Sequence, residues 1–387
     1  YFSFRSTSIY FCFSHHIYQF RARIISNIVN LFIWARRSII FSMSMFSKRL
    51  LKWHKKEGRK DLPWQQDITP YKVWISEIML QQTQVSTAIP YFLEFIQRFP
   101  NIETLANSSE DEVLSYWSGL GYYTRARNIF KSAKLIKSEF KSKIPDSIEE
   151  LVSLPGIGRS TAGAIRSIGY GLKAPILDGN VKRVLSRYFK IEEDLSKSSA
   201  QKELWLLAEE LLPKSSFNIY SQAIMDLGAI VCKQNNPNCS SCPQNKNCLA
   251  YKHDLTELIP AKAKKKEKPR RNLYWLVAID QKGRFALQQK NQNGVWEGLW
   301  TFLEFEETGL RDDYSKNLIK ESNLISKEKL KIKHSFSHYN LDIDSLILKF
   351  ESESSKKLVN NQTWFNVSDL KSIGTPAPVS KIIEKVI

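Results

Sequence analysis

Residues 154–163 read Leu-Pro-Gly-Ile-Gly-Arg-Ser-Thr-Ala-Gly and connect two segments with helical periodicity. Gly156 and Gly158 allow the backbone to approach a ligand closely and are expected to adopt positive φ. The free N–H groups at the start of the following helix then face outward, which makes this turn a ready site for an anion. Taken alone, the stretch fits a phosphate-binding hairpin, and it also fits a glycine-rich helix connection that binds nothing.

The charge of the chain indicates which anion to expect. Lys and Arg number 57 and Asp and Glu 39, which gives a formal net charge of +18. So basic a chain favours a polyanionic partner, either nucleic acid or an anionic membrane surface. No stretch reaches the roughly 18 uninterrupted apolar residues of a membrane span, because Asn27, Asn30 and the pair Arg36–Arg37 interrupt residues 24–45. We therefore expect a DNA phosphate at the hairpin and no membrane partner.

The first 44 residues are expected to lie outside the fold. The first 56 residues contain no Asp or Glu, and they are rich in Ser, Arg and aromatic residues, which is typical of an organelle targeting segment. The sequence begins with Tyr1 rather than Met. Residues 1–44 therefore fit either such a segment or upstream sequence before a start at Met43 or Met45.

The length of 387 residues suits two to three domains of about 150 residues, and the hydrophobic share of 42% is enough to build buried cores. Residues 45–260 are predicted to form an all-α domain, because apolar residues recur there at spacings of three and four. Predicted helices cover 73–88, 111–117, 124–139, 148–153, 159–169, 180–189 and 199–212. Prolines are expected to mark boundaries at Pro63, Pro70, Pro90, Pro100, Pro145, Pro155, Pro175 and Pro213.

Residues 261–271 are predicted to be a basic linker, after which the pattern changes to alternating strands. We expect 272–387 to be an α+β domain with an antiparallel sheet. The predicted strands are 272–280, 284–290, 299–305, 331–337 and 341–350, and the predicted helices are 313–321 and 379–386.

Four of the five cysteines, Cys232, Cys239, Cys242 and Cys248, lie within one loop with the spacing C-x6-C-x2-C-x5-C. So few cysteines in so long a chain indicate a reducing compartment rather than a disulfide scaffold. A structural zinc site usually pairs two C-x2-C units a dozen or more residues apart, and only one is present here. The pattern favours a [4Fe–4S] cluster held by four thiolates, with zinc or disulfides as the alternatives.

Three further motifs carry a resemblance to a known family. They are Leu62-Pro-Trp64, residues 70–85 (Pro-Tyr-Lys-Val-Trp-Ile-Ser-Glu-Ile-Met-Leu-Gln-Gln-Thr-Gln-Val) and residues 119–128 (Gly-Leu-Gly-Tyr-Tyr-Thr-Arg-Ala-Arg-Asn). Together with the hairpin, Asp178 and the cysteine loop, they resemble the helix-hairpin-helix DNA glycosylase superfamily, and within it the iron–sulfur adenine DNA glycosylases of the MutY type. The resemblance runs from about residue 47 to 260 and, more loosely, over 272–387.

This resemblance implies the roles of two carboxyl groups. Cleavage of an N-glycosidic bond needs an acid for the leaving base and a carboxylate beside an oxocarbenium-like sugar. Glu77 lies mid-helix among apolar residues, which would raise its pKa and suit an acid, and by resemblance it protonates adenine N7. Asp178, an N-cap candidate, would by resemblance stabilise the sugar cation and steer water, with Asn180 orienting it.

Position 160 decides the reaction type. In relatives that also cut the strand, the resemblance places a lysine here, which forms a Schiff base with C1′. Here it is Ser160, so we expect a monofunctional hydrolase. The adenine must leave the stack, and the resemblance makes Gln82 and Tyr122 wedge residues, with Thr83 and Leu120 beside them. Other predicted contacts are Gly156, Gly158, Ser160 and Lys182 for DNA, and Leu62 and Trp64 for the base pocket.

Residues 272–387 resemble the Nudix (MutT-like) fold of the same family. The hydrolase signature of that fold needs a Glu-rich helix that holds magnesium, and residues 306–324 lack it, so phosphate hydrolysis is not expected. By resemblance, this domain recognises 8-oxoguanine opposite the adenine through Phe336, Ser337 and His338. An ordinary surface loop is the alternative for these three residues.

The sequence thus predicts an adenine DNA glycosylase that acts on adenine opposite 8-oxoguanine or guanine in double-stranded DNA, as a monomer. Two alternatives are an endonuclease III-like enzyme for oxidised pyrimidines and a non-catalytic iron–sulfur protein that binds DNA. Ser160 and the second domain disfavour the first, and the pair Glu77 and Asp178 disfavours the second. A cytoplasmic, bacterial-type location is expected, with the nucleus or mitochondrion as the eukaryotic alternative.

Overall fold

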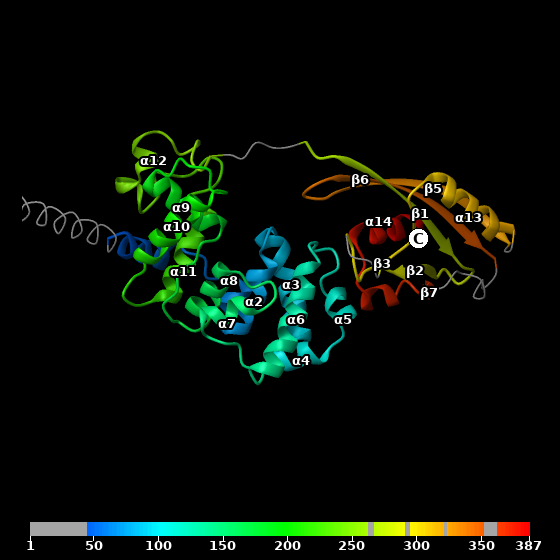
Figure 1. Cartoon of the computed structure of the whole chain (residues 1–387), viewed down its shortest axis with the longest axis horizontal. Helices are drawn as coiled ribbons and strands as arrows, with labels where there is room; N and C mark the ends of the chain where they lie inside the picture. Colours follow the sequence, from blue (N-terminus) through cyan, green and yellow to red (C-terminus); the bar gives the residue numbers. More distant parts are fainter. Residues whose placement is uncertain (1–44, 262–266, 291–294, 321–322, 352–361) are drawn as a thin grey trace, which may run out of the picture. The chain divides into compact units, whose positions relative to one another are not determined.

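The computed structural model describes residues 45–261, 267–290, 295–320, 323–351 and 362–387. The proposed N-terminal extension 1–44 and most of the basic linker lie outside these residues. The chain forms two compact units (Figure 1). The first contains residues 45–59 and 171–261, and the second contains residues 60–170 and the described residues from 267 to 387. These units follow spatial contacts, so the domain limits placed at 260 and 272 from composition stay predictions.

The first unit is helical and ends in the cysteine loop. A buried carboxylate, Asp226, fixes its N-terminal helix: it accepts hydrogen bonds from Arg59 at 2.7 and 2.9 Å and lies 3.2 Å from His54 Nε2. Phe46 packs edge-on against Tyr188 at 4.8 Å. The elements are the helix 45–57, α9 (Gly179–Phe189), α10 (Ser198–Glu210), α11 (Phe217–Asp226), the π-helical turn η3 (Leu227–Val231), η4 (Asn245–Asn247) and α12 (Leu249–Lys252).

The second unit begins with a set of short helices. Their bounds are η1 (Pro63–Gln65), α2 (Pro70–Met79), α3 (Val85–Arg98), α4 (Ile102–Asn107), α5 (Glu110–Ser115), α6 (Thr124–Glu139), α7 (Ile148–Ser153), α8 (Arg159–Ala164) and the π-helical turn η2 (Ile165–Gly169). The single helix predicted over 73–88 is wrong, because α2 ends at Met79 and α3 begins at Val85. Pro90 lies inside α3 instead of at a boundary, since the apolar face of Ala88, Phe92 and Phe95 is buried on both sides of it.

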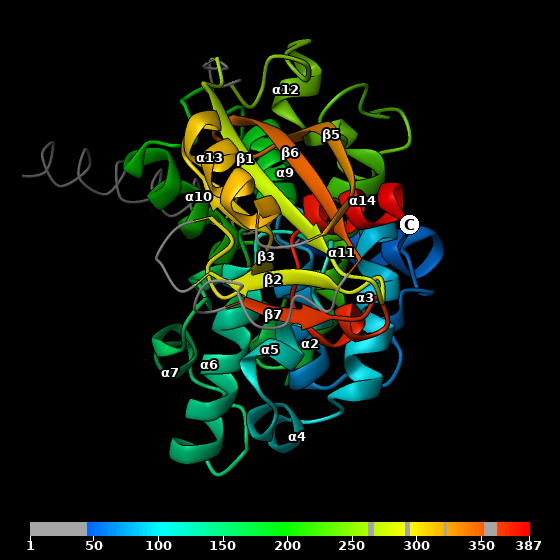
Figure 2. The ribbon, with the colours of Figure 1, turned by 90° about the vertical axis from the view of Figure 1, so that its right-hand side faces the viewer.

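The same unit contains a seven-stranded sheet, whose long strands are seen lengthwise in Figure 2. Its path is β3-β2-β1-β6-β5, and β4 and β7 pair with β1 and β2. The bounds are β1 (Arg270–Ile279), β2 (Phe285–Gln289), β3 (Trp300–Thr301), β4 (Leu303–Phe305), α13 (Thr308–Lys320), β5 (Leu324–Ser335), β6 (Asn340–Phe350), β7 (Gln362–Phe365), η5 (Asp369–Ser372) and α14 (Ala377–Val386). The fully antiparallel sheet predicted from sequence is wrong, because β1 and β6 pair in parallel over their length.

One face of this sheet forms a core under α13. Leu318 of α13 packs with Leu276, Leu346, Leu348 and Phe350 from β1 and β6. Among the described residues, β5 is an edge strand that pairs with β6. It leads directly into residues 336–338, so the sheet places the predicted lesion-reading residues at the end of a long, firmly paired hairpin.

Candidate active site and DNA interface

Asp178 caps the N-terminus of α9. Its Oδ1 accepts the backbone N–H of Val181 at 2.8 Å, and its other oxygen accepts the side-chain amide of Asn180 at 3.1 Å. Burial raises the pKa of Asp178, and the hydrogen bonds from Val181 and Asn180 and the charge of Arg183 partly offset this. The two interpretations of Asp178 therefore coincide: it is an N-cap, and it is a buried carboxyl with a fixed orientation.

A chain of hydrogen bonds continues from Asp178 to the cysteine loop. Arg183 donates to Asn180 Oδ1 at 2.8 Å, to the carbonyl of Gly228 at 2.8 Å and to the carbonyl of Cys232 at 2.7 Å. Residue 228 must be small here, because a Cβ would lie 2.5 Å from the Cβ of Asn180. Asn180 is thus held from both sides, which fits the orienting role predicted for it.

The four cysteine thiols line one cavity, together with Arg187 and Thr256. Arg187 Nη1 lies 3.4 Å from Cys232 Sγ, and the N–H of Gln244 donates to Cys242 Sγ at 3.4 Å. Burial raises the pKa of the thiols of Cys239 and Cys248, and that of Cys242 to about 12. N–H donors face the sulfurs of Cys232 and Cys242, as they do around iron–sulfur clusters.

The shape of this cavity bears on which group it fits. Within the described ranges, no group of three or more His, Cys, Asp and Glu side chains is arranged to hold a metal ion. The four thiols instead surround a shared space. Four thiol donors around one cavity fit an iron–sulfur cluster and also a tetrahedral zinc ion, so the choice between them stays a prediction.

Glu77 lies in α2, whose N-terminus is capped by Thr69 and begins with Pro70. Its side chain is half-buried, and its helix neighbours Trp74 and Ile78 are 1% and 2% exposed. A carboxyl group with apolar residues on one side has the surroundings expected of a proton donor. Glu77 belongs to the second unit and Asp178 to the first, so the pairing of these two carboxyl groups stays a prediction.

The hairpin joins α7 to α8 as expected, with one difference. Gly156 has φ of +80°, and a Cβ there would lie 2.8 Å from the Cβ of Asn128. Gly158 instead has φ of −84° and is the N-cap of α8, so the positive φ predicted for it is wrong. Ser160 is half-buried in the first turn of α8. Gly158 has no Cβ contact within 4 Å, which leaves the backbone accessible at that point.

Two of the predicted wedge residues lie in strained turns. Gln82 has φ of +57° and is exposed, and Tyr122 has φ of +52° with 44% of its surface exposed. Non-glycine residues rarely adopt such angles, and they occur preferentially at functional sites. Leu120 is only 7% exposed, so it lies on the buried side of its turn. Thr83 is half-buried.

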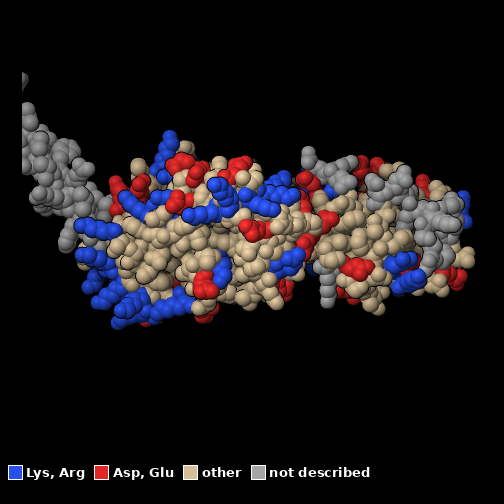
Figure 3. All heavy atoms as spheres, turned by 90° about the horizontal axis from the view of Figure 1, so that it is seen from below, with Lys and Arg blue, Asp and Glu red and all other residues tan. Residues whose placement is uncertain are grey.

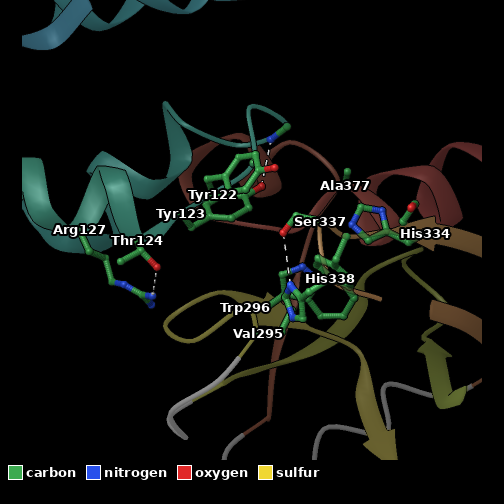
Figure 4. Close-up of a pocket in the computed structure, with 14 residues that line it drawn as sticks. Tyr122, Tyr123, Thr124, Arg127, Val295, Trp296, His334, Ser337, His338 and Ala377 are labelled. Carbon is green, nitrogen blue, oxygen red and sulfur yellow. Dashed lines mark hydrogen bonds between the residues drawn. The ribbon is translucent and has the colours of Figure 1, made fainter. Parts of the chain in front are cut away.

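The Tyr122 turn and residues 336–338 line the same pocket, which has a volume of about 450 Å³ (Figure 4). Phe336, Ser337 and His338 lie on the sheet side, and the Ser337 hydroxyl lies 3.3 Å from His338 Nδ1. Tyr122 and Thr124 lie on the helical side. The residues that the resemblance singled out in two distant segments are therefore brought together.

Trp296 was missed by the sequence reasoning. Its ring lies 5.5 Å from that of Phe336 and 5.9 Å from that of His334, its φ is +66°, and it lines the pocket. Burial and then the charge of Lys381 lower the pKa of His334. Trp296 packs against the loop 334–338, and no motif in the sequence marks this contact.

Polar contacts join the two sides of this pocket. The Tyr123 hydroxyl donates to the carbonyl of Thr375 at 2.9 Å, and Ser118 Oγ accepts the N–H of Thr375 at 3.2 Å. Burial raises the pKa of Tyr123 to about 12, so its hydroxyl stays a donor. Arg127 also donates to the carbonyl of Glu297. Hydrogen bonds to Thr375 therefore fix the turn that contains Tyr122.

Three other predicted site residues are Leu62, Trp64 and Lys182. Leu62 and Trp64 are 6% and 7% exposed, and Trp64 packs edge-on against Phe92 at 5.5 Å. Lys182 is half-buried on α9. The base-pocket and DNA contacts assigned to them stay predictions.

The surface charge suits a polyanion on at least one face. In Figure 3, Lys and Arg side chains gather on the surface of the first unit. Residues Lys48, Lys52 and Lys56 recur every fourth position along the helix 45–57 and are all exposed, so they form one basic stripe. Across the part of the chain that the structure describes, no helix is long and apolar enough to cross a membrane.

Comparison with known proteins agrees with this geometry. Residues 75–210 match the family of HhH-GPD superfamily base excision DNA repair proteins, and residues 274–385 match the NUDIX domain. The chain is 42% identical to the adenine DNA glycosylase of Buchnera aphidicola subsp. Baizongia pistaciae, over 88% of this chain and 97% of the relative. It is 32% identical to that of Schizosaccharomyces pombe, over 85% and 84%.

A thermostable thymine-DNA glycosylase of known structure is 26% identical with a TM-score of 0.49, covering 55% of this chain and 97% of that one. Both adenine enzymes match over at least 84% of this chain and of their own sequences, which favours an adenine enzyme over both alternatives weighed from the sequence. The chain belongs to the adenine DNA glycosylase family, whose members are base excision repair enzymes that act on N-glycosyl bonds.

Proposed function

We propose that this glycosylase removes adenine paired with 8-oxoguanine or guanine from double-stranded DNA and leaves an abasic site. One observation carries the proposal: the exposed Tyr122 and residues 336–338 line a single aromatic pocket of about 450 Å³. That volume lies within the range of small-molecule sites. An aromatic pocket with a hydroxyl and an imidazole suits an oxidised purine, which has both a π face and polar edges.

Glu77 is the proposed acid that protonates N7 of the extruded adenine. Its half-buried position on α2 beside Trp74 and Ile78 supports this role, because an apolar flank favours the protonated form of a carboxyl group. Protonation makes adenine a neutral leaving group, so the bond from C1′ to N9 can break with its electron pair going to the base.

Asp178 is proposed to face the sugar as a carboxylate that stabilises the developing positive charge and positions the attacking water. Its two oxygens are held by Val181 and Asn180, and such fixed orientation is what electrostatic stabilisation of a transition state needs. Asn180 acts through Asp178 by holding it. Because Ser160 provides no amine nucleophile, the reaction ends with hydrolysis.

The proposed DNA contacts divide between the duplex and the extruded base. Gln82 and Tyr122 enter the duplex as wedge residues, supported by Thr83 and Leu120, while Leu62 and Trp64 wall the base pocket. The hairpin residues Gly156, Gly158 and Ser160 approach a phosphate, and Lys182 adds a cation. The positive φ and exposure of Gln82 and Tyr122 support the wedge role, since such backbone strain persists mainly where function requires it.

Cys232, Cys239, Cys242 and Cys248 would hold the [4Fe–4S] cluster, which on binding supplies a rigid, charged centre that organises its loop. Arg187 and the N–H of Gln244 orient the sulfurs. We further expect a monomer, because the pocket is completed within one chain. The bacterial relatives favour a cytoplasmic location.

The experiment is a comparison of three duplexes, which carry A:8-oxoG, A:G or thymine glycol, each incubated with the enzyme and then cleaved with alkali at abasic sites. We expect cleavage on the adenine strand of the first two and none on the third. Glu77→Gln should abolish it with DNA binding nearly intact, whereas the exposed control Glu103→Gln should not. Cleavage at thymine glycol, or Glu77→Gln activity within about tenfold of wild type, contradicts the proposal.

A further inference from the structure

Arg125 is a buried cation at the first turn of α6. It is 9% exposed, and burial lowers its pKa to about 10, so it stays charged at neutral pH. Burying a guanidinium is costly unless its donors are satisfied. The acceptors of its Nη1 and Nη2 groups come from two separate loops, and each loop carries one exposed wedge residue.

The first set of partners is the end of α2 and the turn that follows. Nη1 donates to three carbonyl oxygens at 2.6–2.9 Å, those of Ile78, Met79 and Gln81. Nη2 donates to Thr83 Oγ1 at 3.3 Å. A cation at the carboxyl end of a helix also opposes its dipole. The contacts bracket Gln82, so Arg125 stabilises the turn in which Gln82 has positive φ.

The second set of partners is the turn 119–122. Nη2 donates to the carbonyl of Gly121 at 3.0 Å, directly before Tyr122. The guanidinium carbon lies 5.4 Å from the centre of the Tyr122 ring and 5.3 Å from that of Trp117. The indole of Trp117 donates to the same Gly121 carbonyl at 3.0 Å. The Tyr122 ring is therefore held from below by a cation.

We propose that Arg125 is a positioning residue that fixes the Gln82 and Tyr122 turns to each other as one rigid wedge for base extrusion. This rests on the wedge role proposed for those two residues. A planar guanidinium with donors in a fork can reach both turns at once, whereas the ammonium group of lysine cannot. Arg125 is buried, so it acts through the two wedge side chains rather than on the DNA itself.

The test measures extrusion separately from chemistry. 2-Aminopurine placed beside the target adenine in an A:8-oxoG duplex brightens when its stacking is lost, and stopped-flow mixing with saturating enzyme gives the extrusion rate. Arg125→Lys should slow extrusion roughly tenfold or more and lower the melting temperature, because several charge-assisted hydrogen bonds are lost. Arg311→Lys, at a fully buried arginine of α13 that bonds Asp344, is the matched control: it should also lower the melting temperature but extrude like wild type.

Coupling between the turns gives a second readout. In the wild-type background, Gln82→Ala and Tyr122→Ala should combine to less than the product of their separate effects, because either change disables a shared wedge. In the Arg125→Lys background the two effects should multiply. If Arg125→Lys fails to fold, Thr83→Val removes one acceptor of the guanidinium and should slow extrusion by roughly threefold.

Normal extrusion by Arg125→Lys, or equal losses in Arg125→Lys and Arg311→Lys that follow a drop in melting temperature, overturns the proposal. If Gln82→Ala and Tyr122→Ala extrude normally while wild type still releases adenine, the wedge role falls and this inference falls with it. The glycosylase activity stands in that case. Absence of adenine release by wild type would instead count against the proposed function.

Discussion

Arg183 donates a hydrogen bond of 2.7 Å from Nε to the carbonyl oxygen of Cys232. The same guanidinium holds Asn180 at 2.8 Å, and Asn180 in turn holds Asp178. The backbone of the cysteine loop is therefore connected, through two side chains, to the carboxyl group proposed to face the sugar. A change in the loop can reach Asp178 by this route with no change in the residues of the hairpin.

Arg183→Gln should slow adenine release without loss of iron. Hydrogen bonds from a charged donor contribute about 1.5–3 kcal/mol each, and each 1.36 kcal/mol is a factor of ten in rate, so we expect a rate roughly 10- to 100-fold lower. The measurement is single-turnover release of adenine, with iron content determined on the same preparation.

Arg98→Gln is the control for Arg183→Gln, because Arg98 pairs with Glu112 at the surface of another region. It should release adenine at the wild-type rate. If Arg183→Gln releases adenine normally while retaining iron, the Asn180 contact does not matter for Asp178. If it loses its iron, the effect belongs to the cluster site instead.

Local patterns predicted much of the helical fold. The limits of α6 and α7 match the predicted 124–139 and 148–153, because the apolar spacing that defines each helix lies within its own segment. The turn between α2 and α3 was missed, since Gln81, Gln82 and Thr83 contain no Gly or Pro to signal it. That turn is held by Arg125, which is remote in sequence, and no local pattern contains this information.

The sheet also has features that no local sequence pattern predicts. The strands β1, β2 and β6 were found near their places, because each is a run of apolar and β-branched residues. The parallel pairing of β1 with β6 was missed, since β2, α13 and β5 intervene along the chain and pairing direction is a property of the whole topology. α4, α11 and β7 were also absent from the prediction, α4 and β7 being only six and four residues long.

In the site, the sequence points to candidate residues. It does not point to the residues that hold them in place. The four cysteines and the cap at Asp178 follow from spacing and residue type. Trp296 and Arg125 act through contacts with distant segments, and neither has a sequence signature. The pocket between residues 119–124 and 334–338 likewise exists only after folding.

Cys239→Ser should lose iron, lose the broad visible absorbance of an iron–sulfur cluster and bind duplex DNA more weakly, because the cluster organises its loop. Ser241→Ala is the control: its hydroxyl lies in the same loop and donates to the carbonyl of Asn238, away from the sulfurs, so iron should remain. Stoichiometric zinc without iron in wild-type protein purified under anaerobic conditions would reject the cluster.

Ser160→Lys should introduce strand-cleaving activity, because an amine at this position of α8 would lie beside C1′ and could form a Schiff base. Borohydride reduction traps that species as a covalent protein–DNA adduct, which wild type should not form. Ser160→Ala serves as the control for loss of the hydroxyl. Persistent base removal without any trapped adduct in Ser160→Lys means that residue 160 does not face the sugar.

Replacement of Phe336, Ser337 and His338 by alanine should reduce discrimination more than chemistry. These residues line the pocket opposite Tyr122, while Glu77 and Asp178 lie outside it. Well-formed base contacts contribute roughly 1–3 kcal/mol each, so binding and processing of A:8-oxoG should weaken while A:G changes less. The measurement is the ratio of single-turnover rates and affinities on the two duplexes at one fixed salt concentration, because phosphate binding by so basic a chain varies steeply with salt.

The triple variant is a cleaner test than removal of residues 272–387. Thr375 accepts the Tyr123 hydroxyl and donates to Ser118, so the truncation should also loosen the Tyr122 turn and slow reaction on both duplexes. The triple variant leaves these contacts in place and should change the ratio alone. Leu310→Ala, at a residue of α13 that is 58% exposed, should change neither quantity. If the ratio stays unchanged in both the triple variant and the truncation, residues 272–387 contribute nothing that distinguishes 8-oxoguanine from guanine. Lesion recognition would then lie elsewhere in the molecule.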